Sequence, residues 1–402
     1  MGSKLGRSKR MPVVVLGRGL TVLGVIRALG REGVRSYCLE LQQMYVARSR
    51  WHRAIESGAP PAESQSLDLV LAKLPLERAV VIPCTDNWVR AVANLPPEVA
   101  SKFPSSVPPA SAVELFIDKR NFHTLLKAQE IPHPLTVELK SESDLSADNI
   151  AHLEHGFLKP CDSQAFGTLF RRKAFTFDSR DEALARYREA TQAGLAVIMQ
   201  EYIPGPPTEH FFLDGFVDRE GRFKAWFARR RLRMHPMPFG NSTYLVSVGL
   251  EEVSDGMQSL EKLLTATRYR GIFSAEFKRD QRDGRLKLLE INARPWWYVG
   301  FAVDCGVNVV HMAYLDALKM EVPEKVNYPN GVHFVFTAYD GMACRMLHEA
   351  GKLSKADWFR QWATAKQALF VWYDPWPSTR AWIIRISRAI VRRVLRRPPS
   401  PV

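Results

Sequence analysis

The sequence predicts an α/β domain built on a parallel sheet, followed by an α+β domain with a large antiparallel sheet. The chain has 402 residues, of which 46% are hydrophobic and 24% are charged. That is the composition of a soluble globular protein of two or three domains. Near its beginning, short apolar strands alternate with helices, as in parallel sheets. After residue 155, strands follow one another through long turns, which is typical of antiparallel pairing.

The α/β domain is predicted over residues 11–110. Short apolar runs predict strands at residues 12–17, 34–39 and 80–83. Helices are expected at residues 20–30 and from Thr85 onward. Residues 103–109 are rich in proline, and we expect them to form the loop near which this domain ends.

The α+β domain is predicted over residues 111–325. Its first helix, residues 118–129, ends before Pro132 and Pro134, which force an extended chain. Strands are expected at residues 155–160, 168–173, 197–202, 210–217, 222–233, 271–279 and 285–292. Further helices are expected at residues 180–193, 254–267 and 308–320. Residues 326–402 form a C-terminal extension in this interpretation.

The net charge of +14 is concentrated at the two ends of the chain. Residues 1–10 carry four basic groups and residues 375–402 carry seven arginines, with no acid in either segment, which leaves +3 on the body. A body that binds nucleic acid would carry the excess itself, so no nucleic-acid partner is expected. In residues 379–397, apolar side chains recur at helical steps opposite the arginines, as in a helix lying on an anionic membrane surface. A helix docked on protein has the same periodicity, so both interpretations stay open.

The five cysteines are scattered singly, which argues against a disulfide framework and against a zinc site. No run of about 18 uninterrupted apolar residues predicts a membrane-spanning helix. Arg18 interrupts the first apolar run, so we do not expect a secretory signal. We expect a cytoplasmic protein, peripheral on the inner face of the membrane if the C-terminal helix binds lipid. The sequence leaves a homodimer open.

The turn after the first strand contains Gly17, Gly19 and Gly24, and the second strand ends near Glu40. This resembles a dinucleotide-binding turn with a ribose-binding acid, but the third glycine comes too late for that spacing. A tight turn in a doubly wound sheet is therefore the preferred interpretation. The free N–H groups of the helix that begins near Gly19 would still attract a substrate carboxylate.

Two apolar strands joined by a turn at residues 281–284 each carry a carboxylate. Antiparallel pairing would set Glu276 across from Glu290, with Asn292 projecting from the same face. Two carboxylates and an amide oxygen repel one another unless a cation joins them, and such oxygen ligands suit Mg²⁺ together with phosphate. The alternative is a cross-strand pair neutralised by Lys278 or Lys287.

Other segments have features of nucleotide binding. Lys159 interrupts an apolar strand, and the small polar residues that follow predict a loop that could face phosphate. The strand at residues 197–202 ends in a hinge whose backbone could read an adenine edge, and Glu209 beyond it could accept from ribose hydroxyls. The alternative to phosphate binding is that these lysines are ordinary surface residues, and this alternative fits Lys119 better than Lys159.

In this combination and order, the segments resemble the ATP-grasp superfamily over roughly residues 12–320. The resemblance is carried by the motifs VVVLGRG…VIRALG, IDKRNFHTLLKAQEIPHP, FLKP, QEYIPG and EFKRD…LLEINARPWW. The chain is most similar to the carbamoyl-phosphate-synthase-like group, which includes D-aspartate-ligase-like carboxylate–amine ligases. The resemblance implies an ATP-grasp fold with an N-terminal Rossmann-like pre-ATP-grasp domain and a lid subdomain at about residues 135–205.

The resemblance also implies the cofactors ATP and Mg²⁺ (or Mn²⁺) and a role for each motif. The residues that would contact or cover the ATP phosphates are Lys119, Lys159, Ser163, Gly167 and Thr168. Those that would hold adenine and ribose are Glu201, Tyr202, Ile203 and Glu209. The metal ligands would be Glu276, Glu290 and Asn292, and Arg294 would meet the transferred phosphate. The covering loop has a single glycine where relatives often have several, which is a departure from the pattern.

The sequence offers only hints about the substrate. Arg231 and Arg233 alternate on one strand face and could bind a carboxylate or the phosphate, although a solvated basic strand end has the same pattern. The aromatic run at residues 296–298 could line a pocket or pack internally.

Together these features predict an ATP- and Mg²⁺-dependent ligase that joins a small-molecule carboxylate to an amine through an acyl phosphate. Lys159 and Arg294 would be the catalytic cations, and no histidine base is expected because the histidines show no clustering. Two alternatives stay open: an inactive nucleotide-binding scaffold at the membrane surface, and an ATP-grasp phosphotransferase that does not ligate.

Overall fold

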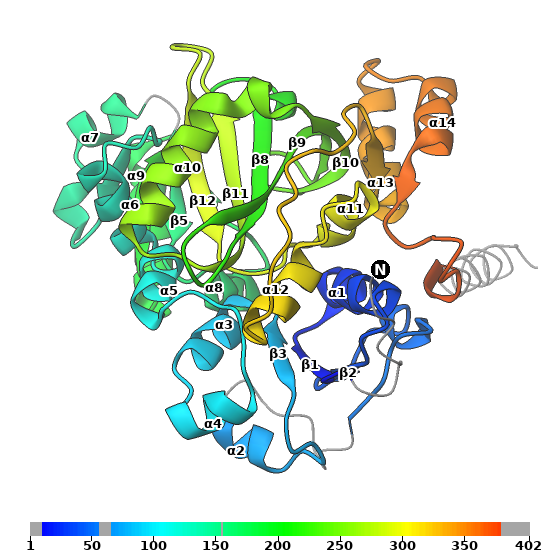
Figure 1. The fold of residues 1–402 in the computed structure, drawn as a ribbon. Helices are drawn as coiled ribbons and strands as arrows, with labels where there is room; N and C mark the ends of the chain where they lie inside the picture. The colour runs from blue at the N-terminus through cyan, green and yellow to red at the C-terminus, as the bar shows by residue number, and fades with distance from the viewer. Residues whose placement is uncertain (1–9, 56–65, 154–155, 379–402) are drawn as a thin grey trace, which may run out of the picture.

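A computed structural model describes residues 10–55, 66–153 and 156–378. It contains a three-stranded, a seven-stranded and a four-stranded sheet. Figure 1 shows the large sheet at the centre, with the N-terminal domain below it and the lid to one side. The predicted combination of α/β and α+β organisation is confirmed.

The N-terminal sheet is parallel and has the order β2–β1–β3. Its strands are β1 (Val13–Leu16), β2 (Ser36–Cys38) and β3 (Val80–Pro83). The helices around them are α1 (Gly19–Arg31), α2 (Leu67–Ala72), α3 (Asp86–Ala93) and α4 (Pro97–Lys102). Both α1 and α3 begin just beyond the carboxyl ends of their strands, which is where parallel sheets bind ligands.

The glycine turn between β1 and α1 is a tight turn, as preferred from the sequence. Gly17 has φ +129°, and a Cβ there would lie 2.9 Å from Cys84 Cβ, so neither its backbone nor its surroundings accept a side chain. Glu40 pairs with Arg18 at 2.8 Å and accepts a hydrogen bond from Trp88 Nε1 at 2.5 Å. Its carboxylate is therefore engaged in holding the turn.

The seven-stranded sheet has the order β12–β11–β8–β9–β10–β13–β14. Its strands are β8 (His210–Val217), β9 (Phe223–His235), β10 (Asn241–Val248), β11 (Gly271–Arg279), β12 (Leu286–Asn292), β13 (His333–Val335) and β14 (Lys366–Gln367). One face packs against α5 (Ala110–Ile117), α6 (Lys119–Ala128) and α10 (Ser254–Ala266). The other face packs at one end against α1, α11 (Val299–Asp304) and α12 (Val309–Ala317).

Alternation along β11 divides this sheet into an apolar and a polar face. Phe273, Ala275 and Phe277 belong to the core on the α10 side. The intervening Ser274, Glu276 and Lys278 therefore point to the opposite face. We call this opposite face, where it carries polar side chains, the site face.

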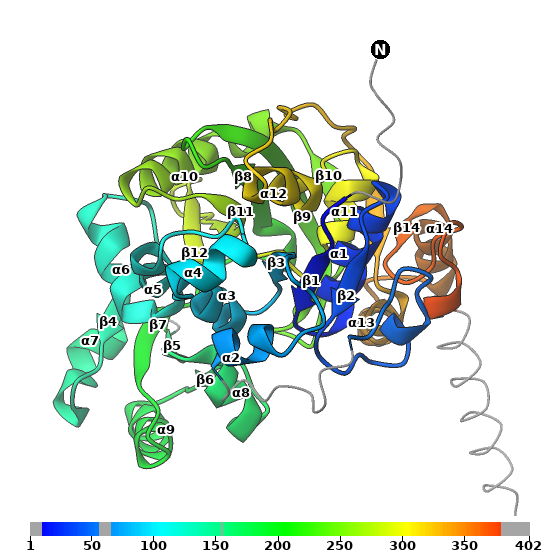
Figure 2. The ribbon, with the colours of Figure 1, turned by 60° about the horizontal axis from the view of Figure 1, so that its bottom comes forward.

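The lid is an antiparallel sheet of β4 (Thr136–Glu138), β7 (Val197–Glu201), β5 (Gly156–Pro160) and β6 (Phe175–Thr176). Its helices are α7 (Ala147–His152), α8 (Ser163–Phe170) and α9 (Arg180–Gln192). Figure 2 shows α8 and α9 at the edge of the molecule, on the side of the N-terminal domain away from α1.

The predictions of a loop at Ser163, Gly167 and Thr168 and of a strand at residues 168–173 are wrong, because Ser163–Phe170 form helix α8. The role of these residues in covering the phosphates stays a prediction. Asp162 Oδ1 accepts from Ala165 N at 2.9 Å and so caps the helix. Phe166 is fully buried and lies 4.7 Å from Phe170, ring to ring, one helical turn later. This spacing stabilises a helix, and the polar residues around it obscured that pattern in the sequence.

The C-terminal extension adds β13, β14, α13 (Thr337–Glu349) and α14 (Lys355–Thr364) beside β10. Sequence analysis missed β10, because its first residues are polar and it follows two prolines. The predicted helix at residues 379–397 lies outside the described residues.

A buried ion pair attaches the C-terminal extension to the N-terminal domain. Asp374 accepts hydrogen bonds from Arg27 Nε at 2.9 Å, Ser49 Oγ at 2.7 Å and the backbone N–H of Arg50 at 2.9 Å. Arg27 is 6% exposed and Asp374 is fully buried. Because both side chains are buried, each charge is compensated by the other and by hydrogen bonds from or to neighbouring protein groups.

We expect Asp374→Asn to lower the free energy of unfolding by about 3–5 kcal/mol, because breaking a buried pair leaves one charge uncompensated. Chemical denaturation of the full chain measures this loss. Glu189→Gln removes a partly exposed pair with Arg186 (2.9 Å) and serves as the control, with little change expected. Equal stabilities for the two variants would contradict this account of the ion pair.

Candidate functional site

Polar side chains from four neighbouring strands meet on the site face. Glu276 of β11 pairs directly with Glu290 of β12, and Ser274 pairs with Asn292. The hairpin and its register are those expected from the sequence. The pairing register of β11 and β12 shifts between Glu276 and Phe277. Such an irregularity bends the hairpin where the two carboxylates oppose each other.

Glu276 is held by two side chains of the same face. Arg231 Nη2 of β9 lies 2.9 Å from Glu276 Oε1, and His210 Nδ1 of β8 lies 3.0 Å from the same oxygen. Burial alone would raise the pKa of Glu276, but the positive charge of Arg231 and the hydrogen bond from His210 bring it well below its usual range. Burial and Arg231 lower the pKa of His210 to about 4, so its neutral ring donates from Nδ1.

Neither lysine proposed as the neutralising partner of Glu276 has that role. Lys278 Nζ donates to the carbonyl oxygen of Ile203 at 2.5 Å. Lys287 Nζ lies 2.6 Å from Asp283 Oδ2, in the hairpin turn. That alternative is therefore wrong, and Arg231 supplies the neighbouring charge instead.

Glu290 and Asn292 lie among cations at the other side of the pair. Lys119 Nζ, at the start of α6, is 3.7 Å from Glu290 Oε2. Asn292 Nδ2 is 3.5 Å from Glu290 Oε1, while Arg294 Nη2 donates to Asn292 Oδ1 at 3.0 Å. Lys119 is only 9% exposed, so it is not the ordinary surface lysine considered from the sequence.

Arg294 is also bound by a residue that sequence analysis missed. Asp86, the first residue of α3, accepts from Arg294 Nε at 2.7 Å and from Nη2 at 3.3 Å. The signal in the sequence was its place three residues after the end of β3, at the carboxyl edge of the parallel sheet. The N-terminal domain thus contributes a carboxylate to this cluster.

Two lysines of the lid face the same cluster. Lys159 Nζ of β5 lies 3.2 Å from the carbonyl oxygen of Leu289 and 3.4 Å from Gln200 Oε1. Burial and the positive charge of Lys119 lower the pKa of Lys159 to about 8. Lys173, which sequence analysis did not single out, donates to Asn241 Oδ1 at 2.7 Å.

The hinge after β7 has side chains that hold its shape. Glu201 is 5% exposed and accepts from the backbone N–H of Leu135 at 2.7 Å and from Arg282 Nη2 at 2.8 Å. Tyr202 lies with its ring centroid 4.3 Å from Lys278 Nζ. Glu209 Oε1 lies 3.3 Å from Arg230 Nη2. Any contact of Glu201 with adenine would therefore come from its backbone.

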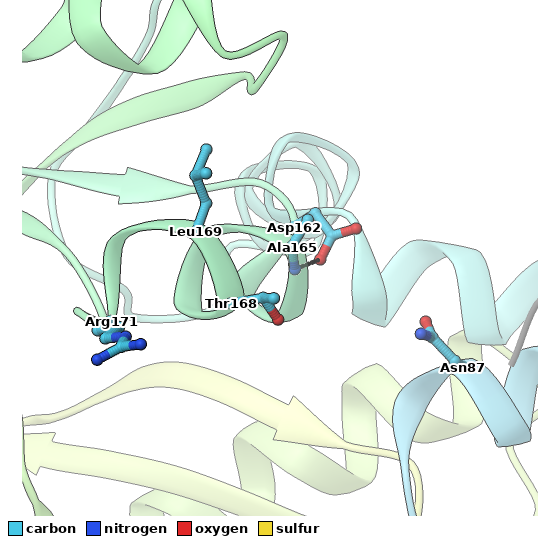
Figure 3. A pocket seen from close by; sticks show the side chains of 6 residues that line it. All are labelled: Asn87, Asp162, Ala165, Thr168, Leu169 and Arg171. Carbon is cyan, nitrogen blue, oxygen red and sulfur yellow. Dashed lines mark hydrogen bonds between the residues drawn. The ribbon is translucent and has the colours of Figure 1, made fainter. Parts of the chain in front are cut away.

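A cavity of about 520 Å³ lies between α3 and α8. Its lining residues are Asn87, Asp162, Ala165, Thr168, Leu169 and Arg171. Figure 3 shows Asn87 on one side of this space and the α8 segment on the other. All three residues predicted to cover the phosphates, Ser163, Gly167 and Thr168, lie on this helix, and Thr168 lines the cavity itself.

The residues suggested for substrate binding have different surroundings. Arg231 is 4% exposed and Arg233 is 7% exposed, so a solvated basic strand end is excluded. Arg233 binds Asp340 of α13 through Nε and Nη2, both at 2.9 Å, and therefore holds the C-terminal extension. Gly19 begins α1 with φ +78°, and a Cβ there would lie 3.7 Å from the hydroxyl oxygen of Tyr45.

The aromatic run that follows Arg294 packs internally. Trp296 and Tyr298 are each 4% exposed, and Tyr298 donates to the carbonyl oxygen of Ser242. Trp297 stacks on Tyr298 with the ring centroids 5.1 Å apart. Of the two interpretations of this run, internal packing accounts for Trp296 and Tyr298.

In residues 10–55, 66–153 and 156–378, no cluster of three or more His, Cys, Asp or Glu side chains could hold a metal ion. All five cysteines are buried and unpaired. Within the same ranges, we find no helix with the length and apolarity needed to cross a membrane.

The chain is similar to several known proteins along most of its length. No family model matches the chain. D-aspartate ligase of Enterococcus faecium (strain Aus0004) is 23% identical over 322 residues, covering 75% of this chain and 76% of that protein. Among solved structures, the biotin carboxylase domain of Hydrogenobacter thermophilus 2-oxoglutarate carboxylase, a dimer in complex with MgADP, ADP and bicarbonate, superposes with a TM-score of 0.62. The identity is 17%, over 81% of this chain and 74% of that one.

The chain has the ATP-grasp fold. L-amino acid ligase from Bacillus licheniformis shares it with a TM-score of 0.56 and 14% identity, over 77% of this chain and 74% of that one. N5-carboxyaminoimidazole synthetase from Staphylococcus aureus, complexed with ADP, gives a TM-score of 0.59 and 12% identity, over 78% and 79% of the two chains. These similarities show the fold, and what the relatives bind and catalyse can only support a proposal about this chain. The roles of individual residues and a homodimer stay predictions.

Because Gly167 lies inside α8 without a positive φ, we expect Gly167→Ala to raise the free energy of unfolding by about 0.5–1 kcal/mol. Gly194→Ala is the matched control, since Gly194 has φ +72° and nothing within 4 Å of an added Cβ. We expect that variant to be less stable by about 1 kcal/mol because of backbone strain. Denaturant titration compares both, and destabilisation by Gly167→Ala would contradict a helical resting state of this segment.

Proposed function

We propose that the protein is an ATP- and Mg²⁺-dependent ligase that joins a carboxylate to an amine through an acyl phosphate. The observation that carries this proposal is the opposed pair Glu276 and Glu290, surrounded by Lys119, Lys159 and Arg294. Two carboxylates that face each other need a cation between them, and the surrounding cations need an anion. Magnesium and a triphosphate together satisfy both requirements.

The donor set fits a magnesium ion that also binds phosphate. Glu276 and Glu290 supply carboxylate oxygens from neighbouring strands, and Asn292 Oδ1 supplies a neutral oxygen. Because Mg²⁺ usually takes one or two carboxylates and completes its shell with phosphate and water, a three-residue site is sufficient. Bound Mg²⁺ would supply positive charge that offsets the charge of the phosphate groups.

In the proposed reaction, a carboxylate oxygen attacks the γ-phosphorus of ATP, and ADP departs with the electron pair of the broken P–O bond. The amine nitrogen then attacks the acyl carbon, and inorganic phosphate leaves with the electron pair of the C–O bond. The nitrogen releases its surplus proton to water. Lys119, Lys159 and Arg294 hold the phosphoryl oxygens in place, so no protein nucleophile is needed.

The relatives support amino acids as the substrate class. One relative is named a D-aspartate ligase and one structural neighbour an L-amino acid ligase. We therefore propose that at least one substrate is an amino acid, in either configuration. The full chain with ATP and Mg²⁺ should release phosphate with pooled D- and L-amino acids, which supply both a carboxylate and an amine, and should release none with pooled carboxylic acids that lack an amine. Phosphate transfer without an amine would indicate a phosphotransferase, and binding without turnover would indicate a scaffold.

Glu290→Gln should abolish phosphate release in this assay while the chain stays folded, because the amide keeps the size but loses the charge that a metal ion needs. The expected loss is at least 100-fold, within the range for removing a group that stabilises charge in the transition state. Glu142→Gln, at an exposed pair with Arg188 on the lid, is the control and should retain activity. Undiminished turnover in Glu290→Gln would refute the role of Glu290.

We also propose that the basic C-terminal segment attaches this cytoplasmic protein to an anionic membrane surface. Residues 379–397 alternate arginines with apolar side chains, and each basic residue near such a surface adds about 1 kcal/mol. The described chain leads into this segment with Trp372 and Trp376, which are 88% and 62% exposed. Exposed tryptophans are typical of the membrane–water interface. Docking of the same segment on protein remains the alternative.

Deletion of residues 375–402 should abolish sedimentation with vesicles of phosphatidylglycerol and phosphatidylcholine, since it removes seven arginines and no acid. Vesicles of phosphatidylcholine alone are the control and should bind neither form. The shortened chain keeps Asp374 and its contacts, so its unfolding transition checks that the fold is intact. Unchanged sedimentation of the shortened chain would remove the membrane proposal.

A further inference from the structure

Asp86 connects the N-terminal domain to the candidate phosphate site. It lies three residues after the end of β3, and its two oxygens accept from Nε and Nη2 of Arg294. Ligands of parallel α/β sheets bind outside the carboxyl ends of the strands, which is where Asp86 lies. The ligase mechanism proposed above uses Arg294 but assigns no role to Asp86.

Asp86 has room for a second partner besides Arg294. Its side chain is 42% exposed, whereas that of Arg294 is 20% exposed. Each carboxylate oxygen has about two acceptor positions, and Arg294 occupies one on each oxygen. Burial alone would raise the pKa of Asp86, but the charge of Arg294 lowers it below its usual range. Asp86 is therefore an ionised carboxylate with unused acceptor capacity.

The cavity between α3 and α8 is lined by the residue that follows Asp86 in the chain, and not by Asp86 itself. Asn87, the next residue of α3, lines this cavity opposite Asp162 and Thr168 (Figure 3). A volume of about 520 Å³ is large enough for a small molecule. Asp86 thus joins two features: it contacts Arg294 at the phosphate site, and its neighbour in the helix lines the adjacent space.

We propose that Asp86 binds the ammonium group of the incoming amine and positions it beside the acyl phosphate. This proposal rests on the ligase function proposed above, and it defines the second substrate as an amine that is protonated in solution. In the resting protein the carboxylate pairs with Arg294. A bound phosphoryl group attracts Arg294, and the acceptor positions of Asp86 then face a cationic nucleophile.

A simpler role for Asp86 would be to orient Arg294 for phosphate binding. The two roles differ in how they depend on the charge of the nucleophile. Hydroxylamine is largely uncharged near pH 7.5 and traps acyl phosphates as hydroxamates, whereas amino acids carry an ammonium group. Loss of an ammonium-binding carboxylate therefore impairs the reaction with amino acids more than the reaction with hydroxylamine.

The experiment compares wild type with Asp86→Asn, using full-length protein, ATP, Mg²⁺ and pooled amino acids with and without hydroxylamine. We expect the ratio of amide to hydroxamate to fall at least tenfold and the KM for the amine to rise. The matched control is Glu114→Gln. Glu114 Oε1 lies 2.6 Å from Nε of Arg90, which is on α3 like Asp86, so this variant also removes a carboxylate that pairs with an arginine. Its ratio should equal that of wild type.

An equal loss of both products in Asp86→Asn would show that Asp86 acts only through Arg294 and would overturn the proposal. An unchanged ratio with full activity would overturn it as well. Binding of Mg²⁺ and a non-hydrolysable ATP analogue provides a readout without substrates, and we expect Asp86→Asn to bind it as tightly as wild type or more tightly. Binding tenfold weaker than wild type contradicts the proposal. If wild type releases no phosphate with either nucleophile, the ligase function has failed, and this inference fails with it.

Discussion

The repulsion between Glu276 and Glu290 is the constraint on which the site depends. Backbone pairing of β11 with β12 places Glu276 and Glu290 opposite each other on one face of the sheet. Like charges at paired positions of a partly buried site repel each other unless cations compensate them. Neighbouring elements supply these cations: Arg231 of β9 beside Glu276, and Lys119 of α6 beside Glu290.

This arrangement leaves the two carboxylates without a common partner among the described residues. Arg231 and His210 bind one oxygen of Glu276, Oε1. Lys119 lies 3.7 Å from Glu290, which is longer than a strong hydrogen bond, so this carboxylate is only weakly engaged. A divalent ion between them would therefore displace little, and the lysines and Arg294 would then be available to phosphate oxygens. Within this part of the chain, the carboxylates lack a shared cation and the surrounding lysines and arginine lack a shared anion, and a metal–triphosphate complex would supply both.

Sequence analysis predicted the hairpin, its register and most of the central strands because alternation and a polar turn are local signals. It failed where stability comes from distant partners or is masked by polar residues. Helix α8 depends on Phe166, which packs on Phe175 of the following strand, and the polar start of β10 hides its pairing with β9 and β13. Asp86 lies more than 200 residues from Arg294 in the chain, so no local pattern could link them.

The C-terminal extension is part of the structure that supports the site. Arg233 is two residues from Arg231 on β9, and Asp340 of α13 binds it through both oxygens, with Thr243 and Trp358 donating to the same carboxylate. Beyond this contact, Asp374 binds Arg27 of α1. The extension therefore connects β9, whose Arg231 binds Glu276, to the N-terminal domain, which supplies Asp86. A rigid connection of this kind matters because phosphoryl transfer depends on positioning more than on a reactive side chain.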